Sequence, residues 1–391
     1  MQIEEIEIKN YRLFRDVRLK DLTPMTVVVG ANGSGKSTLF DVFSFLKDAL
    51  TQNVAVAVAR RGGYKELVSR GQDGPIAITV KFRESGGRLA TYQLEIGSDE
   101  GRAVVQHELL KFRRGSAGKP WHFIDFTFGE GSAITNEAAL GKAGAKEKRD
   151  KFHLDDPSVL AIKGLGQFQK FRVVSEFRGL IENWHISDFH IGEARQSAEA
   201  GIAEHLSMRG DNIAQVAQFI YEKHPQVFQE ILRSMRERVP GVLSVEAKPM
   251  EDGRLVLKFQ DGSFKDPFIS KYVSDGTIKM FAYLVLLHDP RPHPLLAIEE
   301  PENQLYPELM RELIEEFRDY ARRGGQVFVS THSPEFLNGA HLNEIFYLRK
   351  ENGFSTIHKV SNCQLLRELV VEGEVPGALW LQGLFQEATR S

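Results

Sequence analysis

Hydrophobic periodicity in the first 50 residues predicts two strands, a third buried strand, a loop and a helix. Apolar residues alternate with polar ones at 6–8 and again at 17–19, which is typical of half-buried strands. Residues 25–29 read Met-Thr-Val-Val-Val, a pattern that favours a strand buried on both faces. A glycine-rich loop covers 30–35. From residue 36 onward, helical spacing links Leu39, Val42, Phe43 and Leu46.

The next part of the chain predicts antiparallel β structure. Alternating apolar residues at 76–82, 92–96 and 121–128 indicate strands, and glycines at 86 and 87 supply a turn. Residues 129–170 are rich in Gly, Ala and Lys and lack a clear period. We therefore expect an exposed loop or short helices there.

The second half of the chain predicts a helical segment followed by an α/β core. Residues 211–238 have helical spacing, and Pro225 is well placed to open a second helix. A hairpin is expected over 243–259, around an Asp-Gly turn. No heptad pattern is sustained, which argues against a long coiled coil. The remaining predicted elements are a helix at 277–287, a strand at 295–298, a helix at 307–323 and a strand at 326–330.

Composition restricts the class of protein. The 391 residues are 42% hydrophobic and 26% charged, close to an ordinary globular chain. The single cysteine, Cys363, excludes a disulfide framework, a thiolate zinc cluster and a CxxC motif, so we expect a reduced, cytoplasmic compartment. The longest apolar run, 280–287, is far below the roughly 20 residues that a bilayer requires, so we expect no membrane association. A net charge of −3 argues against a wholly basic nucleic-acid binder but permits a local basic patch.

The strongest chemical motif is the sequence GANGSGKS at residues 30–37, a complete phosphate-binding P-loop. Its glycines let the backbone wind tightly and direct N–H groups toward phosphate oxygens. The N-terminal end of the following helix adds positive potential. Lys36 is expected to reach the β- and γ-phosphates, and the Ser37 hydroxyl to bind Mg²⁺. The flanking strand and helix distinguish this motif from a chance glycine-rich turn.

Two further motifs follow predicted strands. Residues 295–298 end in Glu299 and Glu300, which a buried strand would deliver to the ligand-binding edge of an α/β sheet. We expect Glu299 to hold Mg²⁺ through water and Glu300 to polarise the attacking water. His332, in the sequence STHSP after the next strand, is placed to donate to a γ-phosphate or hold the water. Either motif alone is common in proteins. The P-loop upstream makes a role in nucleotide hydrolysis the favoured interpretation of both.

The order of these motifs resembles that of ABC-type ATPases. A P-loop is followed by the sequence VSDGT at 273–277, then by EEPEN at 299–303, then by STHSP at 330–334. More narrowly, the chain looks like the OLD-like branch, relatives of the RecF and SMC ATPases often described as AAA-family ATPases. The resemblance covers residues 1–96 and 265–350.

The resemblance implies an α/β fold: an ABC-type P-loop NTPase core with an attached antiparallel β-sheet and an inserted mixed β/helical lobe. The first part of the core, with the P-loop and the β-subdomain, is expected at 1–108. The inserted lobe is expected at 109–264. The second part of the core, with the signature, the acidic pair and the histidine, is expected at 265–391.

The resemblance also implies a homodimer that closes around ATP and Mg²⁺. The VSDGT segment of one subunit would then contact the γ-phosphate held by the other, and Glu302-Asn303-Gln304 would resemble the D-loop at the interface. Arg12, in the segment NYRLF, becomes a candidate phosphate or base contact. The expected nucleotide-binding residues are Gly30, Ala31, Asn32, Gly33, Ser34, Gly35, Lys36, Ser37, Thr38, Arg12, Ser274, Asp275 and Gly276.

Three departures from the ABC pattern stand out. VSDGT replaces the transporter sequence LSGGQ, which argues against a transporter subunit. Glu299 replaces the more usual aspartate at the metal position. A Q-loop is not evident, and Gln93 and Gln106 are the candidates, unless both are ordinary strand residues.

Two functions remain open at this point. The resemblance favours an ATPase that senses or regulates in prokaryotic defence against phage or plasmids, with a separately encoded effector such as a nuclease. No D-x-D pair follows His332, which argues against a built-in nuclease. The alternative is a RecF- or SMC-like DNA-repair ATPase that clamps DNA.

Two weaker features complete the sequence analysis. Residues 185–190 contain metal-ligand types, but no matching distal cluster supports a metal site there. The run 142–151 is basic and is either a solvated loop or a contact for DNA or RNA phosphates. Its cations are Lys142, Lys146, Lys148, Arg149 and Lys151.

Overall fold

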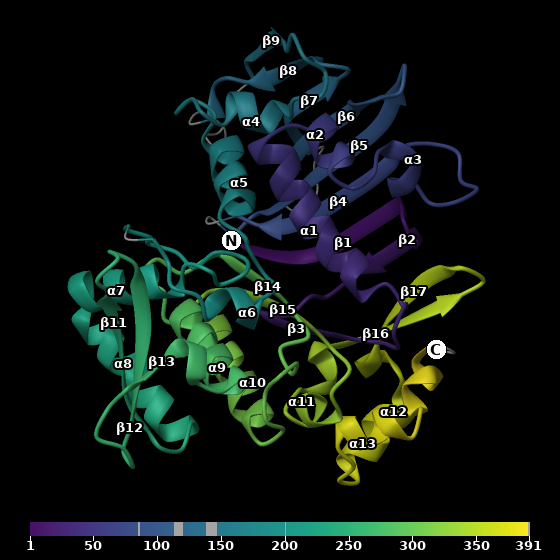
Figure 1. The fold of residues 1–391 in the computed structure, drawn as a ribbon. Helices are drawn as coiled ribbons and strands as arrows, with labels where there is room; N and C mark the ends of the chain where they lie inside the picture. Colours follow the sequence, from purple (N-terminus) through teal and green to yellow (C-terminus); the bar gives the residue numbers. More distant parts are fainter. Residues whose placement is uncertain (85–86, 113–119, 138–146, 200, 390–391) are drawn as a thin grey trace. The chain divides into compact units, whose positions relative to one another are not determined.

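The structure is a computed structural model that describes residues 1–84, 87–112, 120–137, 147–199 and 201–389. The chain forms two compact units, each built from more than one segment (Figure 1). Unit 1 contains residues 1–184, 342–373 and 383–391, and unit 2 contains residues 185–341 and 374–382. In the part of the chain that is described, every helix is too short or too polar to traverse a lipid bilayer.

Unit 1 contains an eight-stranded antiparallel sheet in the order β2-β1-β4-β5-β6-β7-β8-β9. The predicted alternation is confirmed: Ile8 of β1 pairs with Val17 of β2, and both side chains are buried. The strands are β1 Gln2–Tyr11, β2 Phe14–Leu19, β4 Ile76–Arg83, β5 Leu89–Asp99, β6 Arg102–Phe112, β7 Trp121–Thr127, β8 Glu130–Ile134 and β9 Arg149–His153.

Helices cover one face of this sheet (Figure 1), and aromatic side chains contribute to the packing. Phe177 of α5 stacks on Phe82 of β4 with a centroid distance of 4.4 Å and also contacts Tyr92 of β5. Tyr11 of β1 contacts Phe45 of α1 edge-on. These rings are buried and contribute to the apolar core of the unit. The helices are α1 Lys36–Thr51, α2 Val54–Ala59, α3 Tyr64–Leu67, α4 Ala161–Leu165 and α5 Arg172–Glu182.

Unit 1 also carries the strand that leads into the P-loop. This strand, β3 (Met25–Val29), is buried at all five positions, as predicted. It pairs in parallel with β16 (Ile345–Glu351), which pairs antiparallel with β17 (Phe354–Lys359). A strand from the C-terminal part of the chain therefore lies directly beside β3. The helix α12 (Gln364–Val371) follows.

Unit 2 is built on three parallel strands. The strand β14 (Leu295–Glu299) pairs on one side with β10 (His185–Ser187) and on the other with β15 (Gln326–Thr331). The helices α9 and α10 pack together through Tyr283 and Phe317, whose rings meet edge-on. The helices of this core are α6 Ile191–Ala194, α9 Asp275–Leu287, α10 Leu309–Arg322, α11 Pro334–Asn338 and α13 Pro376–Leu381.

A smaller antiparallel sheet completes unit 2. Its strands are β11 (Val242–Pro249), β12 (Leu255–Asp261) and the short β13 (Phe268–Ile269). The helices α7 (Ile213–Lys223) and α8 (Pro225–Arg238) precede it, and Pro225 opens α8 as predicted. Phe259 of β12 meets Phe281 of α9 edge-on, which joins this sheet to the helix α9 of the same unit.

The structure corrects the expectation for residues 129–170. The strands β8 and β9 lie there and extend the large sheet, although we expected a loop or short helices. The short helix α4, at Ala161–Leu165, does agree with the expectation. Both strands are rich in charged and small residues, so the hydrophobic alternation that identifies a strand is weak. Residues 138–146 of this segment lie outside the described residues. The predicted boundary of the inserted lobe, between 108 and 109, falls within β6.

Candidate functional site

In unit 1, the P-loop joins β3 to α1 with left-handed backbone at two glycines. Gly33 has φ of 74° and Gly35 has φ of 105°, a region that disfavours side chains. A Cβ on Gly30 would lie 2.5 Å from the carbonyl oxygen of Leu348. These constraints explain why glycine is required at the fixed positions of the motif. The helix α1 begins at Lys36, as the sequence predicted.

The loop is also supported from the distant strand β17. The Ser355 hydroxyl donates a hydrogen bond of 2.6 Å to the carbonyl oxygen of Ser34. A Cβ on Gly35 would lie 2.7 Å from the same hydroxyl oxygen. Ser355 is buried, so this contact fixes the underside of the loop. Nothing in the local sequence identified Ser355, because it lies 321 residues from Ser34.

The P-loop side chains fit a triphosphate and a divalent cation. The ammonium of Lys36 donates to the carbonyl oxygen of Gly30 at 2.9 Å, so it lies folded over the loop that would hold the phosphates. Ser37 is exposed on the first turn of α1, where its hydroxyl can reach a cation. The first N–H groups of this helix have no intrahelical acceptor and favour an anion. Thr38 is buried.

Arg12 lies beside the P-loop helix, paired with a carboxylate. Its guanidinium Nη1 lies 2.8 Å from Oδ2 of Asp41 in α1. The Tyr11 hydroxyl donates to the same carboxylate oxygen at 2.7 Å, and Arg61 donates to Oδ1 at 2.7 Å. Burial, aided by the charge of Asp41, raises the pKa of Tyr11 well above its usual value. A phosphate or base contact for Arg12 stays a prediction and would compete with this ion pair.

Neither Q-loop candidate lies in a loop. Gln93 is in β5, where its amide oxygen accepts a hydrogen bond of 3.0 Å from Lys111. Gln106 is in β6, with its side chain over Gly97. Both are residues of the antiparallel sheet.

In unit 2, the acidic pair ends β14. Glu299 is the last residue of the strand, and Glu300 adopts a left-handed backbone with φ of 42°. The backbone N–H of Glu300 donates to the carbonyl oxygen of Ser330 at 3.0 Å, which ties the turn to the end of β15. A left-handed conformation is unusual for a residue with a side chain and is held here by its surroundings. The sequence prediction of a strand ending in two carboxylates is confirmed.

His332 and the acidic segment meet at the end of β15. The Nδ1 atom of His332 lies 3.5 Å from a carboxylate oxygen of Glu300 and 3.4 Å from Oε1 of Glu302. That oxygen of Glu302 also accepts the backbone N–H of His332 at 2.9 Å and the Thr331 hydroxyl at 2.8 Å. Asn303 donates to the other carboxylate oxygen of Glu300 at 3.2 Å. Glu302 therefore organises this group, a role that its sequence position alone did not indicate.

A polar cavity of about 430 Å³ opens beside these carboxylates. It is lined by Asp188, Phe189, Lys279, Glu299, Glu300, Asn303 and Gln304. Lys279 is buried and donates to the carbonyl oxygen of Asn303 at 2.7 Å. Burial lowers its pKa from 10.5 to about 8, although the charges of nearby carboxylates oppose this shift. In the sequence, a single lysine within the apolar run of α9 is the signal that could have identified Lys279 as a site residue.

The depressed pKa of Lys279 predicts a pH-dependent stability. Between about pH 8 and 10.5 the unfolded chain holds a proton that the folded chain has lost, so the free energy of unfolding rises with pH in this window. Lys279→Met is expected to remove this contribution, which is at most about 1.4 kcal/mol per pH unit. Urea unfolding at about pH 7.5 and about pH 9.5 measures it. Lys271→Met, at an exposed lysine nearby, should retain the parent's slope. Equal slopes for parent and Lys279→Met would contradict the prediction.

The VSDGT segment starts the helix α9. The Ser274 hydroxyl caps the helix by accepting the backbone N–H of Thr277 at 3.2 Å. Arg195 forms an ion pair of 2.5 Å with Asp275 and also donates to the carbonyl oxygen of Val273. A Cβ on Gly276 would lie 3.1 Å from the carbonyl oxygen of Gln304, so this position favours glycine. Ser274 itself is exposed, as a contact with another molecule requires.

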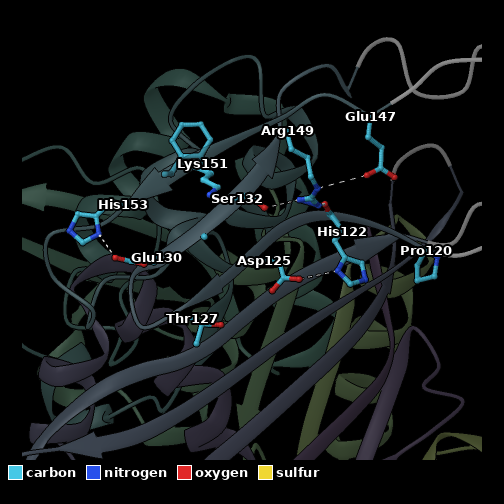
Figure 2. Close-up of a pocket in the computed structure, with 12 residues that line it drawn as sticks. Pro120, His122, Asp125, Thr127, Glu130, Ser132, Glu147, Arg149, Lys151 and His153 are labelled. Atoms are coloured by element: carbon cyan, nitrogen blue, oxygen red, sulfur yellow. Dashed lines mark hydrogen bonds and ion pairs between the residues drawn. The ribbon is translucent and has the colours of Figure 1, made fainter.

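A second polar cavity, of about 960 Å³, lies on the large sheet of unit 1 (Figure 2). Arg149 and Lys151 of the basic run line it, together with acidic side chains such as Glu130 and Asp125. Arg149 is engaged by the protein itself: it donates to the Ser132 hydroxyl at 3.1 Å and to the carbonyl oxygen of His122. Lys148 and Lys151 are exposed. The mixed charge of the cavity weakens the case for a phosphate backbone there.

A protein-family comparison decides the broad class of the chain. Residues 25–338 match the family described as "AAA domain, putative AbiEii toxin, Type IV TA system". The chain belongs to this AAA-domain family. The matched range begins at β3 and ends at α11, so it contains the P-loop, the acidic pair and His332.

Comparison with solved structures shows the fold. The SmcHead bound to the C-winged helix domain of ScpA matches 91% of this chain and 97% of its own, with a TM-score of 0.53 and 14% identity. An Smc head domain with an extended coiled coil, bound to the C-terminal domain of ScpA and derived from Pyrococcus furiosus, matches 94% of this chain and 99% of its own. Its TM-score is 0.54 and its identity 13%. The chain therefore has the α/β fold of an ABC-type P-loop ATPase, as the sequence predicted.

Proposed function

We propose that this protein binds ATP with Mg²⁺ and hydrolyses it to ADP and phosphate. The observation that carries the proposal is the P-loop, whose glycine geometry, folded Lys36 ammonium and exposed Ser37 hydroxyl fit a triphosphate and its cation. Residues 30–38 hold the phosphates, mainly through backbone N–H groups and Lys36. Assignment to the OLD-like branch of this family belongs to the same proposal.

In this proposal, the carboxylates that follow β14 carry out the chemistry. Glu300 accepts the proton of the attacking water, and Asn303 holds the orientation of its carboxylate. His332 holds the water or donates to the γ-phosphate, and Glu302 fixes its backbone. Ser37 and Glu299 hold Mg²⁺, directly and through water respectively. When bound, this ion neutralises charge on the phosphate oxygens.

We further propose that two copies of the chain close around ATP. Ser274, Asp275 and Gly276 form the start of a 13-residue helix, where unpaired N–H groups and the helix dipole favour an anion. The exposure of Ser274 and the support that Arg195 gives Asp275 are consistent with contact to a phosphate held by a second subunit.

A mixed dimer tests this arrangement. Lys36→Ala and Ser274→Arg are each expected to abolish ATPase activity in a dimer of identical subunits, because every composite site then contains one defect. Mixed at equal concentration under exchanging conditions, they form a dimer with one intact site, and phosphate release should recover to roughly a quarter of the parent's rate, assuming statistical exchange and independent sites. The control mixture combines Lys36→Ala with Lys271→Ala in place of Ser274→Arg. One of the two sites in its mixed dimer is free of the Lys36 defect, so this mixture should also release phosphate. Confirmed mixed dimers of the two defective variants without any recovery would refute completion of the site in trans.

The biological role that we propose is sensing or regulation in prokaryotic defence against phage or plasmids. The toxin–antitoxin description of the family supports this role. A separately encoded effector, such as a nuclease, would act on the signal, and the two solved Smc heads offer a parallel because each is bound to a domain of ScpA. Cells carrying the native locus, challenged with phage, should lose protection when Lys36→Ala is introduced. Unchanged plaque counts would contradict the defence role but not the ATPase.

A DNA-repair ATPase that clamps DNA remains the second candidate. The Smc-head fold favours it, since the likeness extends over most of the chain. Stimulation of ATP hydrolysis by duplex DNA, lost on Lys148→Glu with Lys151→Glu, would support this candidate through the described part of the basic run. The same stimulation in the double variant would place any DNA contact elsewhere.

A further inference from the structure

Three potential metal ligands from distant parts of unit 2 meet at the end of β14 opposite the acidic pair. They are His205, in the loop before α7, and Asp289 and His293, in the connection between α9 and β14. One ligand atom from each lies within 4.8 Å of the other two. Along the chain, about 20 Å of extended backbone separates His293 from Glu299, so this group is distinct from the proposed Mg²⁺ residues.

The distances suit a small tetrahedral ion. His205 Nδ1 lies 2.7 Å from Asp289 Oδ2, and His293 Nε2 lies 3.9 Å from the same oxygen. An ion with metal–ligand bonds of about 2 Å holds its ligand atoms about 3.3 Å apart, between these two values. Small rotations of the histidine side chains would therefore make the two nitrogen–oxygen distances equal. Because His205 is half-exposed, its side chain has room to rotate.

Each ligand is held by the structure around it. The backbone carbonyl of His205 accepts a hydrogen bond from Asn212 at 3.0 Å, and that of His293 accepts the Tyr320 hydroxyl at 2.6 Å. Asp289 is buried, and its Oδ1 accepts the backbone N–H of Arg291 at 2.8 Å, which leaves Oδ2 directed at the histidines. These contacts fix the backbone of the two histidines and the carboxylate of Asp289 before an ion binds.

A neighbouring histidine and an ion pair reinforce the group. His185, at the start of β10, places its ring 4.9 Å from that of His293. Glu204 and Arg291 form an ion pair of 2.5 Å between the same two loops. The sequence drew attention to residues 185–190, but there His190 is exposed and paired with Asp188 instead. The cluster is therefore a product of long-range contacts.

We propose that His205, Asp289 and His293 bind one Zn²⁺ or a similar first-row divalent ion, with water at a fourth position. Two imidazoles and one carboxylate suit zinc, whereas Mg²⁺ prefers oxygen ligands. The ion would tie the loop before α7 to the connection between α9 and β14. A hydrogen-bonded His205–Asp289 pair, without an ion, is the competing explanation.

The proposal is tested by metal binding to the full-length chain. The protein is stripped with a chelator and titrated with Co²⁺ in the absence of nucleotide and Mg²⁺. We expect one equivalent to bind with the intense visible absorption of a tetrahedral site that contains nitrogen ligands. Competition with Zn²⁺ then gives the zinc affinity, and Zn²⁺ should raise the melting temperature by about 2–4 °C at a large excess over its Kd.

Substitutions test whether His205 and His293 are ligands of the metal ion. His205→Ala and His293→Gln are each expected to lower the zinc affinity by more than about 10-fold and to remove the thermal shift. His153→Ala is the matched control, because His153 is an exposed histidine beside two carboxylates in unit 1 and its loss should change nothing. Circular dichroism establishes that the variants are folded, and half-exposed His205 is the safer position for truncation. Absence of the cobalt absorption in the parent, or its persistence in both variants, would overturn the proposal.

Discussion

Lys36→Ala is expected to lower the affinity for ATP by about 100-fold, equivalent to about 2.7 kcal/mol. The ammonium of Lys36 lies over the P-loop, 2.9 Å from the carbonyl oxygen of Gly30, where a bound triphosphate would replace that carbonyl as its partner. Alanine removes a charged donor from a buried position next to the phosphates, and charge-assisted hydrogen bonds are among the stronger polar contacts. Isothermal titration calorimetry with ATP and Mg²⁺ measures the loss.

A matched lysine controls for charge and for folding. Lys20 is exposed and lies just before β3 in the same unit, so Lys20→Ala removes the same charge without touching the loop. It should bind ATP as the parent does. If Lys36→Ala also binds ATP with the parent's affinity, the P-loop is not the nucleotide site.

Glu300→Gln is expected to bind ATP normally and to hydrolyse it at least about 100-fold more slowly. Glutamine keeps the size of the side chain and can still pair with Asn303, which lies 3.2 Å from a carboxylate oxygen of Glu300. It cannot accept a proton from water, so the loss should appear in kcat, with little change in the affinity for ATP. Pre-steady-state phosphate release together with calorimetry separates the two effects.

A nearby glutamate provides the control for this second variant. Glu308 is exposed at the N-terminal end of α10, a few residues beyond the acidic segment, and Glu308→Gln should turn over at the parent's rate. If Glu300→Gln retains its turnover, the catalytic role moves to Glu299 or His332, and the same substitution strategy applies to each. If the proposed dimer forms, the Glu300→Gln variant should accumulate in the closed, ATP-bound dimer. Light scattering would detect this dimer as a doubled mass.

Most secondary structure was predictable because it depends on local chain properties. Period-two alternation identified β1, β2, β4, β5 and β7, and Pro225 marked the start of α8. The strands that were missed also reflect this dependence on local properties. β8 and β9 contain too few apolar residues to show a period, and they become strands because β7 offers a free edge with which β8 can pair. Cooperative pairing of this kind overrides weak local propensity.

The chemical motifs were also local, and the residues that support them were not. The P-loop, the acidic pair and the STHSP segment are contiguous motifs, so the chain itself reveals them as candidates. Ser355 beneath the P-loop and Glu302 beside His332 gain their roles only by contact. A single serine or glutamate carries no pattern, and its environment decides whether its polar atoms organise a site or face water.

The sequence by itself determined many of the strands and helices, the P-loop and the acidic and histidine motifs. Only the tertiary structure decided that Lys279 is buried with a depressed pKa and that His205, Asp289 and His293 converge. The physical reason is the range of the interactions. Periodicity and backbone geometry act over a few residues. Burial and ligand convergence depend on contacts between segments that are distant in the sequence, such as His205 and Asp289, which are 84 positions apart.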